Sequence, residues 1–325
     1  MSAGREVIVP DAALHVVVDG GETFLGRAIV RELAARRIPV RAVTCAAPGV
    51  PAEGIERAVA PLGDAAALAS AVDGATAVVM ARKLLEERPA DGLTFKAVHV
   101  ERTRALLDAS AKAGASRFVY VGMAGTGRGP RAMAEAEDEA EALVAAARPR
   151  SLCLRTSLVV GPGDGHVWRL VRKVRRPWPF MFLAGQGWAR SAPMPARDFG
   201  RCVAALVTGA EFPAGDLGLG GRERITLFEI VQRLSRHLGR RKINLHVIET
   251  IARAGALSIE ALMRRPPVTL ARLSWLLENR VPTTNAARGL LGRFPRKFES
   301  AFGPAPATRP AAAGAAAQTA PRGSA

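Results

Sequence analysis

The sequence contains little that would support metal, disulfide or base-stacking chemistry. Its three cysteines, Cys45, Cys153 and Cys202, lack the C-x-x-C spacing of redox and zinc sites, and its five histidines show no metal-ligand spacing. We therefore expect reduced thiols and no bound metal. A single tyrosine in the chain leaves few aromatic platforms on which nucleic-acid bases could stack.

Long apolar runs and negative charge are also scarce. No segment approaches the roughly 18 residues needed to cross a bilayer, and the first residues lack a signal-peptide pattern, so we expect a cytoplasmic protein. The net charge is +17 and the pI is about 11.3. Such an excess favours polyanionic partners. It consists mostly of Arg in a chain also rich in Ala, Gly and Pro, and no nucleic-acid motif accompanies it, so we expect no specific nucleic-acid partner.

What the sequence does contain is a strand, a glycine turn and a helix start within residues 14–27. The run LHVVV at 14–18 is short, apolar and β-branched, which is typical of a buried strand. Apolar residues then return at helical spacing at Phe24, Leu25, Ile29, Val30 and Leu33. A strand that enters a helix through glycines presents free backbone N–H groups and the positive end of the helix dipole, where a diphosphate can bind.

This stretch resembles the glycine turn of the extended and atypical short-chain dehydrogenase/reductase superfamily, written G-x-x-G-x-x-G. The resemblance implies an α/β fold with a Rossmann-type, doubly wound, mostly parallel sheet and a small C-terminal α/β lobe. It also implies binding of NADP or NAD. The cofactor-binding residues that it implies are Gly20, Gly21, Thr23, Phe24, Leu25, Gly26, Thr44 and Ala81.

Several residues of this region oppose dinucleotide binding. Thr23 replaces the middle glycine, which in the superfamily lets the pyrophosphate approach the backbone. Glu22, with Asp19 nearby, carries a carboxylate to the helix N-terminus, where it could occupy the anion position itself. After the second expected strand, residues 44–46 supply neither the acid that reads the ribose of NAD nor the Arg that accepts the phosphate of NADP. We therefore predict that cofactor binding is weak or lost.

The catalytic positions of the superfamily also differ here. Further strands are predicted at 38–43, 55–59, 76–80, 117–121 and 152–160, and helices at 64–72, 93–113 and 132–147. Matching the superfamily's fifth strand and the following Tyr-x-x-x-Lys helix puts Gly122 at the Ser position, Met133 at the Tyr position and Glu137 at the Lys position. Met cannot exchange a proton, and Glu has the wrong charge to lower a phenol's pKa. Tyr120 lies inside a strand and is interpreted as a packed residue, so we predict no catalytic residue.

A basic and aromatic stretch follows residues 154–164, whose sequence LRTSLVVGPGD resembles the superfamily's strand and Gly-Pro turn. Such a stretch is typical of a surface that contacts an anionic membrane or an acidic protein partner. The alternative interpretation is a solvated charged helix followed by an edge strand. The residues concerned are Trp168, Arg169, Arg172, Lys173, Arg175, Arg176 and Trp178.

The expected domain organisation has four parts. These are an N-terminal extension at 1–13, a Rossmann-type domain at 14–165, a smaller substrate or partner lobe at 166–302 interleaved with the core, and a disordered Ala/Pro/Gly tail at 303–325. Within the lobe, Asp198 is expected to cap a helix, and Thr226 with Glu229 forms a capping box. PPVTLARL at 266–273, Glu278-Asn279 and 286–292 are similar to one branch of the superfamily, the nucleotide-binding accessory subunit of respiratory complex I and its bacterial relatives.

Two functions remain open at this point. The first is an NAD(P)-binding-fold protein with degraded cofactor and catalytic motifs, a pseudoenzyme that acts as a scaffold, assembly or regulatory protein. The second is an NADP-dependent oxidoreductase, reductase or epimerase-like, that acts on an apolar or quinone-like substrate without the usual Tyr-Lys pair. In either case the protein is expected in the cytoplasm, with the basic stretch available for peripheral membrane contact.

Overall fold

The computed structural model describes residues 14–46, 54–125, 130–147, 151–213, 215–263, 266 and 268–303. The expected N-terminal extension and the tail from residue 304 onwards lie outside the described residues. None of the described helices is long and apolar enough to span a bilayer.

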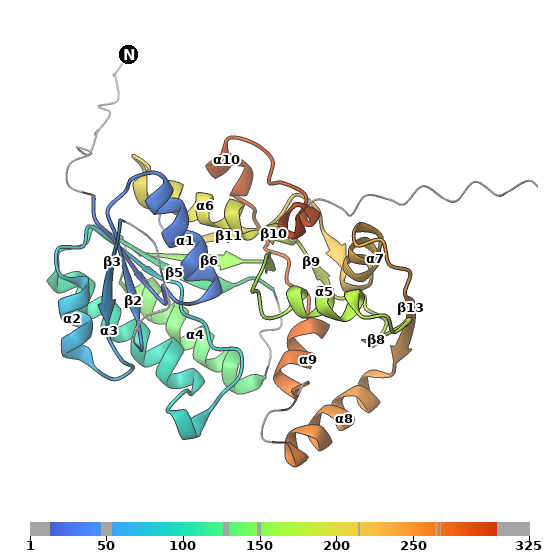
Figure 1. The fold of residues 1–325 in the computed structure, drawn as a ribbon. Helices are drawn as coiled ribbons and strands as arrows, with labels where there is room; N and C mark the ends of the chain where they lie inside the picture. The colour runs from blue at the N-terminus through green and yellow to red at the C-terminus, as the bar shows by residue number, and fades with distance from the viewer. Residues whose placement is uncertain are drawn as a thin grey trace, which may run out of the picture.

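A seven-stranded parallel sheet forms the centre of the Rossmann part, as the resemblance implied (Figure 1). Its strand order is β11-β6-β5-β4-β1-β2-β3. The strands are β1 (Val16–Asp19), β2 (Val40–Thr44), β3 (Ile55–Val59), β4 (Ala77–Met80), β5 (Arg117–Met123), β6 (Ser151–Thr156) and β11 (Gly215–Leu219). The order of the strands reverses between β1 and β4, and in open sheets of this kind ligands bind at the carboxyl ends of the strands beside such a switch.

Helices cover both faces of the sheet (Figure 1). One face carries α1 (Phe24–Ala35), α6 (Ala196–Thr208) and α10 (Ala287–Leu291), and the other carries α2 (Ala65–Val72), α3 (Arg102–Lys112) and α4 (Arg131–Ala146). Helix α1 buries Ile29, Val30 and Leu33 completely against the sheet. The spacing of these side chains explains why the sequence predicted this helix well.

Two predicted elements differ from the observed ones. The helix expected at 93–113 begins instead with a π-helical segment, Lys96–Glu101, that precedes α3, and Val98, His99 and Val100 are all buried there. Such π-helical turns are rare inside helices, and local apolar spacing does not predict them. The strand expected at 152–160 is divided into β6 and β7 (Val159–Val160), because Ser157 bonds through its side chain to Ala192 N and Arg280 O.

The remaining elements form a smaller lobe on a separate apolar core, at the right of Figure 1. Its short strands pair as β10 with β7, β12 with β9, and β13 with β8. The predicted capping box is confirmed, because Thr226 Oγ1 accepts from Glu229 N at 3.2 Å and Glu229 Oε2 accepts from Thr226 N at 2.7 Å. The elements are α5 (Val167–Arg175), β8 (Phe180–Ala184), β9 (Arg190–Ser191), β10 (Met194–Pro195), β12 (Ile225–Thr226), α7 (Leu227–His237), β13 (Ile243–Val247), α8 (Glu249–Leu262), α9 (Leu270–Leu277) and a 3-10 helix (Phe298–Phe302).

The chain passes repeatedly between the two parts, since α6, β11 and α10 come from its second half and join the Rossmann layers. Asp198 is central to one of these connections. It was expected to cap a helix, but α6 has no side-chain cap, and that expectation was wrong. Asp198 is fully buried and accepts from Arg296 N and from the Arg293 guanidinium, each at 2.8 Å. Bonds from charged donors are stronger than a bond to the helix end, which accounts for the difference.

Candidate functional site

A cleft of about 160 Å³ lies between the Rossmann part and the lobe, beside the start of α1. The Rossmann part contributes residues that follow β1 and β4 and residues at the ends of β5 and β6, and the lobe contributes residues from α9 and the loop before α5. The cleft therefore opens at the carboxyl edge of the sheet, where the strand order predicts a ligand site. Its lining includes Thr23, Phe24, Leu25, Ala81, Lys83, Leu85, Gly122, Met123, Ser157, Leu158, Val159, His166, Trp275 and Arg280.

The glycine turn behind the cleft is packed too tightly for side chains at three positions. Gly20 has φ 79°, and a Cβ there would lie 2.9 Å from the backbone of Arg82. A Cβ on Gly26 would lie 2.0 Å from the carbonyl oxygen of Gly20, so α1 packs directly against the turn. Gly21 lies within the same turn, against Ala42. These predicted residues shape the site, while Thr23, Phe24, Leu25 and Ala81 line the cleft.

Thr23 caps helix α1. Its hydroxyl donates to Gly20 O at 2.7 Å and accepts from Gly26 N at 3.1 Å. Thr23, which replaces the middle glycine, therefore already accepts a hydrogen bond from one of the N–H groups at the helix N-terminus. The backbone N–H groups of Phe24 and Leu25 have no acceptor among the described residues, and they face the position where the resemblance puts a diphosphate.

Glu22 does not occupy the helix N-terminus. Its Oε1 lies 2.7 Å from Arg82 NH1 and accepts from the backbone N of Cys45 at 3.4 Å. Cys45 directly follows β2, so the Glu22 carboxylate lies at the end of that strand. Thr44, predicted to contact the cofactor, is buried there and donates its hydroxyl to Ala46 O at 2.9 Å.

Glu22 is connected through Arg82 to a buried network of charged side chains. Asp19 is fully buried, with Oδ1 2.7 Å from Arg102 NH2 and Oδ2 3.4 Å from Arg82 Nε. Burial lowers the pKa of Arg82, but Asp19 and Glu22 outweigh it, so the pKa of Arg82 is raised and the group stays charged. Glu22 Oε2 and Arg82 NH2 are both buried and have no partner in the described residues. Beside β2 the protein therefore holds a buried acceptor and a buried donor whose hydrogen-bonding capacity is unused.

A second cluster of charged side chains lies beside the cleft, which it reaches through Lys83. Lys83 Nζ donates to Tyr120 OH at 2.7 Å and to Glu137 Oε1 at 2.8 Å, and Tyr120 OH donates to Glu137 Oε2 at 3.0 Å. His99 Nδ1 lies 2.8 Å from Glu137 Oε1. Burial raises the pKa of Glu137, but Lys83 and His99 outweigh it and hold that pKa well below its usual value. The carboxylate is therefore ionised and fully paired.

The cluster brings an ammonium beside the single phenol but does not restore the superfamily's proton donor. Burial and the Glu137 carboxylate raise the pKa of Tyr120 well above its usual value, and Tyr120 is fully buried. The superfamily's chemistry needs a phenol with a lowered pKa that reaches the substrate. At the matched Tyr position, Met133 is 1% exposed and packs in the lobe core.

The lobe side of the cleft carries two stacked rings with unpartnered nitrogens. His166 and Trp275 stack with ring centroids 3.7 Å apart. His166 Nε2 and Trp275 Nε1 are buried without a hydrogen-bond partner among the described residues. Burial and nearby arginines, Arg280 among them, lower the pKa of His166 to about 3, so the ring is neutral at neutral pH. This wall can therefore accept or donate hydrogen bonds to a ligand without carrying charge on the imidazole.

Several residues of the site were not predicted from the sequence, because their partners are distant along the chain. Arg82 and Lys83 follow the buried strand β4, and two cations directly after an apolar strand were the one available signal. His99, Arg102, His166, Trp275 and Arg280 carried no comparable signal. In the basic stretch, Trp168 is half-buried and stacks on Phe302, whereas Arg172, Lys173, Arg175, Arg176 and Trp178 are exposed.

Comparison with known proteins agrees with this geometry. Residues 20–157 match the family described as NAD(P)H-binding. A search of curated proteins found no match to the chain. Among solved structures, MoeE5 in complex with UDP-glucose and NAD is 18% identical, with 90% of this chain and 97% of that chain covered and a TM-score of 0.67.

Two epimerases show the same fold. A nucleoside-diphosphate-sugar epimerase from Staphylococcus aureus is 16% identical over 88% of this chain and 99% of that chain, with a TM-score of 0.67. A UDP-glucose 4-epimerase from Thermus thermophilus, in complex with NAD, is 19% identical over 80% of this chain and 97% of that chain, with a TM-score of 0.62. Residues 20–157 are thus similar to an NAD(P)H-binding family, and the chain shares the fold of these two epimerases.

Proposed function

We propose that the protein binds NAD(H) in the cleft and uses the bound dinucleotide structurally or as a signal, in a scaffold, assembly or regulatory role. The cleft residues fit the cofactor. The free N–H groups of Phe24 and Leu25 suit a diphosphate, and the close-packed glycines let it approach the backbone. Thr23 narrows the approach and occupies one donor, so the affinity is reduced but not abolished.

The proposed preference for NAD over NADP rests on Glu22. Dinucleotide folds usually take the acid that accepts the ribose hydroxyls from the end of β2. Here that strand ends without an acid, and the glycine turn supplies one to the same place through Glu22. Its unpartnered Oε2 is an acceptor for a ribose hydroxyl. A 2′-phosphate would meet this carboxylate and be repelled.

The observation that carries the proposed role is the closed cluster of Lys83, His99, Tyr120 and Glu137. Bound NAD(H) supplies hydride chemistry, but a carbonyl reduction also needs a proton donor at the substrate oxygen. Glu137 and Lys83 form an ion pair with each other. The Tyr120 phenol, which bonds to both, is buried and has a raised pKa. The similarity of residues 266–292 to the complex I accessory-subunit branch is in keeping with a structural role.

Binding and turnover should be measured on the same preparation. We expect calorimetry and native mass spectrometry to show one NADH bound per chain, with NADPH bound on the order of tenfold more weakly. NADH oxidation with carbonyl, quinone or sugar-nucleotide substrates should not exceed the rate without protein. Absence of binding at millimolar NADH would contradict the cofactor proposal, and substrate-dependent turnover would contradict the non-catalytic role.

A second candidate is an oxidoreductase that acts on an apolar or quinone-like substrate. The observation in its favour is the apolar wall formed by Leu85, Leu158 and Trp275, with the neutral His166 ring and its buried, unpartnered nitrogen beside it. His166 would then hold the substrate oxygen. Turnover that is lost in His166→Phe, with NADH binding unchanged, would favour this candidate over the first.

A further inference from the structure

The outer surface of the lobe carries an unusual set of exposed apolar side chains on β8 and β13. The two strands run parallel, with Phe180 beside Ile243 and Phe182 beside Leu245. These four side chains are exposed, whereas Met181 and Leu183, which alternate with those of β8, are buried. Alternation along a strand sends these two sets to opposite faces, so the outward face of this strand pair is apolar.

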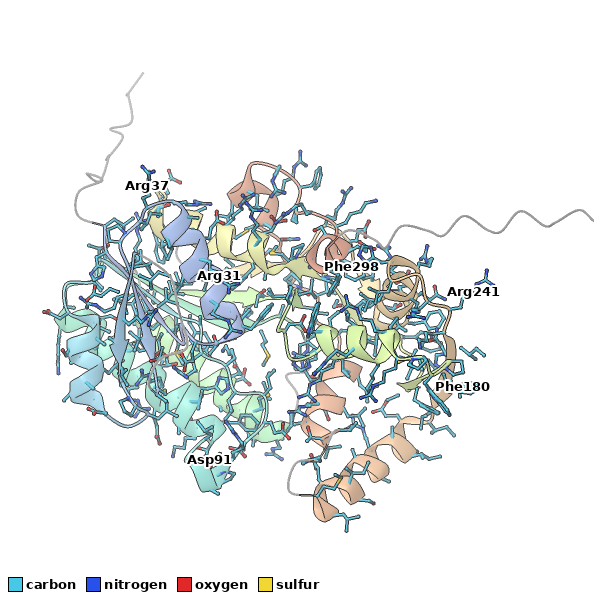
Figure 2. The ribbon with its side chains drawn as sticks, viewed as in Figure 1. Arg31, Arg37, Asp91, Phe180, Arg241 and Phe298 are labelled. Carbon is cyan, nitrogen blue, oxygen red and sulfur yellow. The ribbon has the colours of Figure 1, made fainter. Side chains whose placement is uncertain are left out.

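Cations gather at one end of the same strand pair. Because the strands are parallel, the segments that lead into them begin side by side, and Lys242 Nζ donates to Arg176 O at 2.7 Å across this junction. Figure 2 shows Phe180 and Arg241 projecting from the same end of the molecule. Neither 166–184 nor 231–248 contains an Asp or Glu. The exposed cations here are Arg172, Lys173, Arg175, Arg176, Arg240 and Arg241.

Helix α8, which follows β13, continues this surface. Its charged side chains are paired within the protein, and several of its apolar side chains face solvent. Arg253 donates to Glu249 at 2.8 Å and to Ser274 at 3.1 Å, and Glu260 accepts from Leu270 N at 2.8 Å. The helix otherwise exposes uncharged side chains to solvent. They are Thr250, Ile251, Ala254, Leu257, Ser258, Ala261 and Leu262.

We propose that this face, the β8–β13–α8 face, docks on an anionic lipid bilayer. Exposed Trp178 and Trp188, 58% and 74% accessible, supply aromatic side chains of the kind that lie at the headgroup level. Apolar side chains enter the boundary of the acyl region while the arginines at the end of the strands meet lipid phosphates. This assignment is independent of the cleft and of its cofactor.

A second copy of the chain fits this face poorly. The chain carries a net charge of +17, and a symmetric dimer through the face would bring the two sets of arginines together. An anionic bilayer instead supplies the negative charge that the face lacks, together with an apolar layer wide enough for the strands and the helix. A small acidic protein is the alternative occupant that the experiment must separate.

The test is flotation of the full chain with vesicles of phosphatidylglycerol and phosphatidylcholine, compared with phosphatidylcholine alone. We expect binding to the anionic vesicles, little to the neutral ones, and weaker binding when salt is raised from about 0.1 M to about 1 M, since the screening length falls from about 10 Å to about 3 Å. Tryptophan emission should shift to the blue on binding. The double variant Trp178→Phe/Trp188→Phe should lose that shift while still floating.

Matched variants distinguish specific docking of this face from nonspecific binding of the protein to vesicles. Phe180→Ser/Phe182→Ser and Arg175→Gln/Arg176→Gln should each weaken binding on the order of tenfold. The controls are Phe294→Ser, an equally exposed phenylalanine after α10, and Arg31→Gln/Arg37→Gln on the far side of the molecule in Figure 2, which should bind as the unchanged protein does.

Four outcomes would overturn the proposal. Equal binding to neutral and anionic vesicles, or an equal loss in the control variants, would remove the specific role of the face. No flotation with anionic vesicles would leave an acidic protein as its occupant. A dimer in sedimentation velocity that Phe180→Ser/Phe182→Ser dissociates would assign the face to a second copy. NADH binding should be measured on the same variants. A failure of the membrane proposal can then be distinguished from a failure of the cofactor proposal.

Discussion

At the scale of single residues, the proposed preference of the cleft for NAD rests on Glu22. Glu22→Ala removes the acceptor beside β2 and frees the Arg82 guanidinium, which then suits a phosphate. We expect NADH affinity to fall and NADPH affinity to rise, each on the order of tenfold, or about 1.4 kcal/mol. Calorimetric titration with both cofactors measures this, with Glu32→Gln on α1 as the control that leaves both affinities unchanged.

A gain for both cofactors would contradict this role for Glu22. It would indicate that the carboxylate competes with the dinucleotide for the site instead of binding its ribose. Glu22→Gln refines the result, because the amide keeps an acceptor but loses the charge. It should retain more NADH affinity than Glu22→Ala and should still admit NADPH better than the unchanged protein does.

Glu137 is the residue on which the closed cluster depends for stability. Glu137→Gln leaves the Lys83 ammonium, with a side chain 9% exposed, without a counter-charge, and we expect a loss on the order of 3–5 kcal/mol at pH 7. Chemical denaturation monitored by circular dichroism measures it. Glu135→Gln, two residues earlier on α4 and exposed, should have no measurable effect.

The pH dependence of this loss has a defined sign. The pKa of Glu137 is depressed in the folded protein, so its contribution is present above the pKa of an unfolded Glu, about 4.3, and is lost as pH falls through the lower folded value. The stability difference between Glu137→Gln and the unchanged protein should therefore shrink as pH falls below about 4. A difference that stays constant over this range would contradict the ion-pair assignment.

Sequence reasoning identified the substituted positions but not what they do. Gly122, Met133 and Glu137 were recognised as departures from the superfamily, and from local spacing Glu137 was simply a group of the wrong charge. Its partners Lys83 and His99 come from a loop and a π-helical turn 54 and 38 residues earlier. Only the folded sheet brings these segments together, so neither cluster was visible in the sequence.

At the scale of elements, the start of α1 carries the Thr23 cap and is also where we propose that a diphosphate binds. Thr23→Gly removes the cap, which costs a few tenths of a kcal/mol when Gly replaces Thr at such a position. It also frees Gly26 N and widens the approach to the cleft, so NADH affinity should rise several-fold in titrations.

Thr226→Gly is the matched control for this prediction. Thr226 caps α7 through the same side-chain bond to the third residue of its helix, and it does not line the cleft. We expect a stability loss of the same kind in thermal melts and no change in NADH affinity. An equal change in affinity for both variants would mean that helix stability, and not the cleft, was being measured.

Elements were predictable where one local pattern decided them. The buried strands β1 and β4 begin as continuous apolar runs, and the predicted cap residue of helix α7 acts as a cap. The π-helical start before α3 and the break between β6 and β7 depend on tertiary bonds to Glu137 and Arg280, which the local sequence does not encode.

At the scale of the whole molecule, the two parts are joined by the chain itself, since α6, β11 and α10 belong to the Rossmann layers but come from the half that builds the lobe. The overall architecture followed from the resemblance to the superfamily, whereas the identity of the later segments that return to the sheet did not. We therefore expect the two parts to unfold together.

Asp198 tests this coupling, because it lies on α6 and binds the segment after α10. Burial raises its pKa, but Arg296 and Arg293 outweigh it and lower the pKa, so its contribution is present above about pH 4 and is lost at lower pH. Asp198→Asn keeps the size but loses the charge. We expect a loss on the order of 1–3 kcal/mol at pH 7 and a melting temperature lower by several degrees.

The four tryptophans, at positions 168, 178, 188 and 275, all lie in the lobe, so their fluorescence reports on the lobe while circular dichroism reports on the whole chain. If the parts unfold together, Asp198→Asn lowers both midpoints by the same amount, although the substitution lies in the Rossmann layer. Asp73→Asn, exposed after α2, should lower neither. A fluorescence midpoint that stays fixed while the circular dichroism midpoint falls would show that the lobe folds on its own.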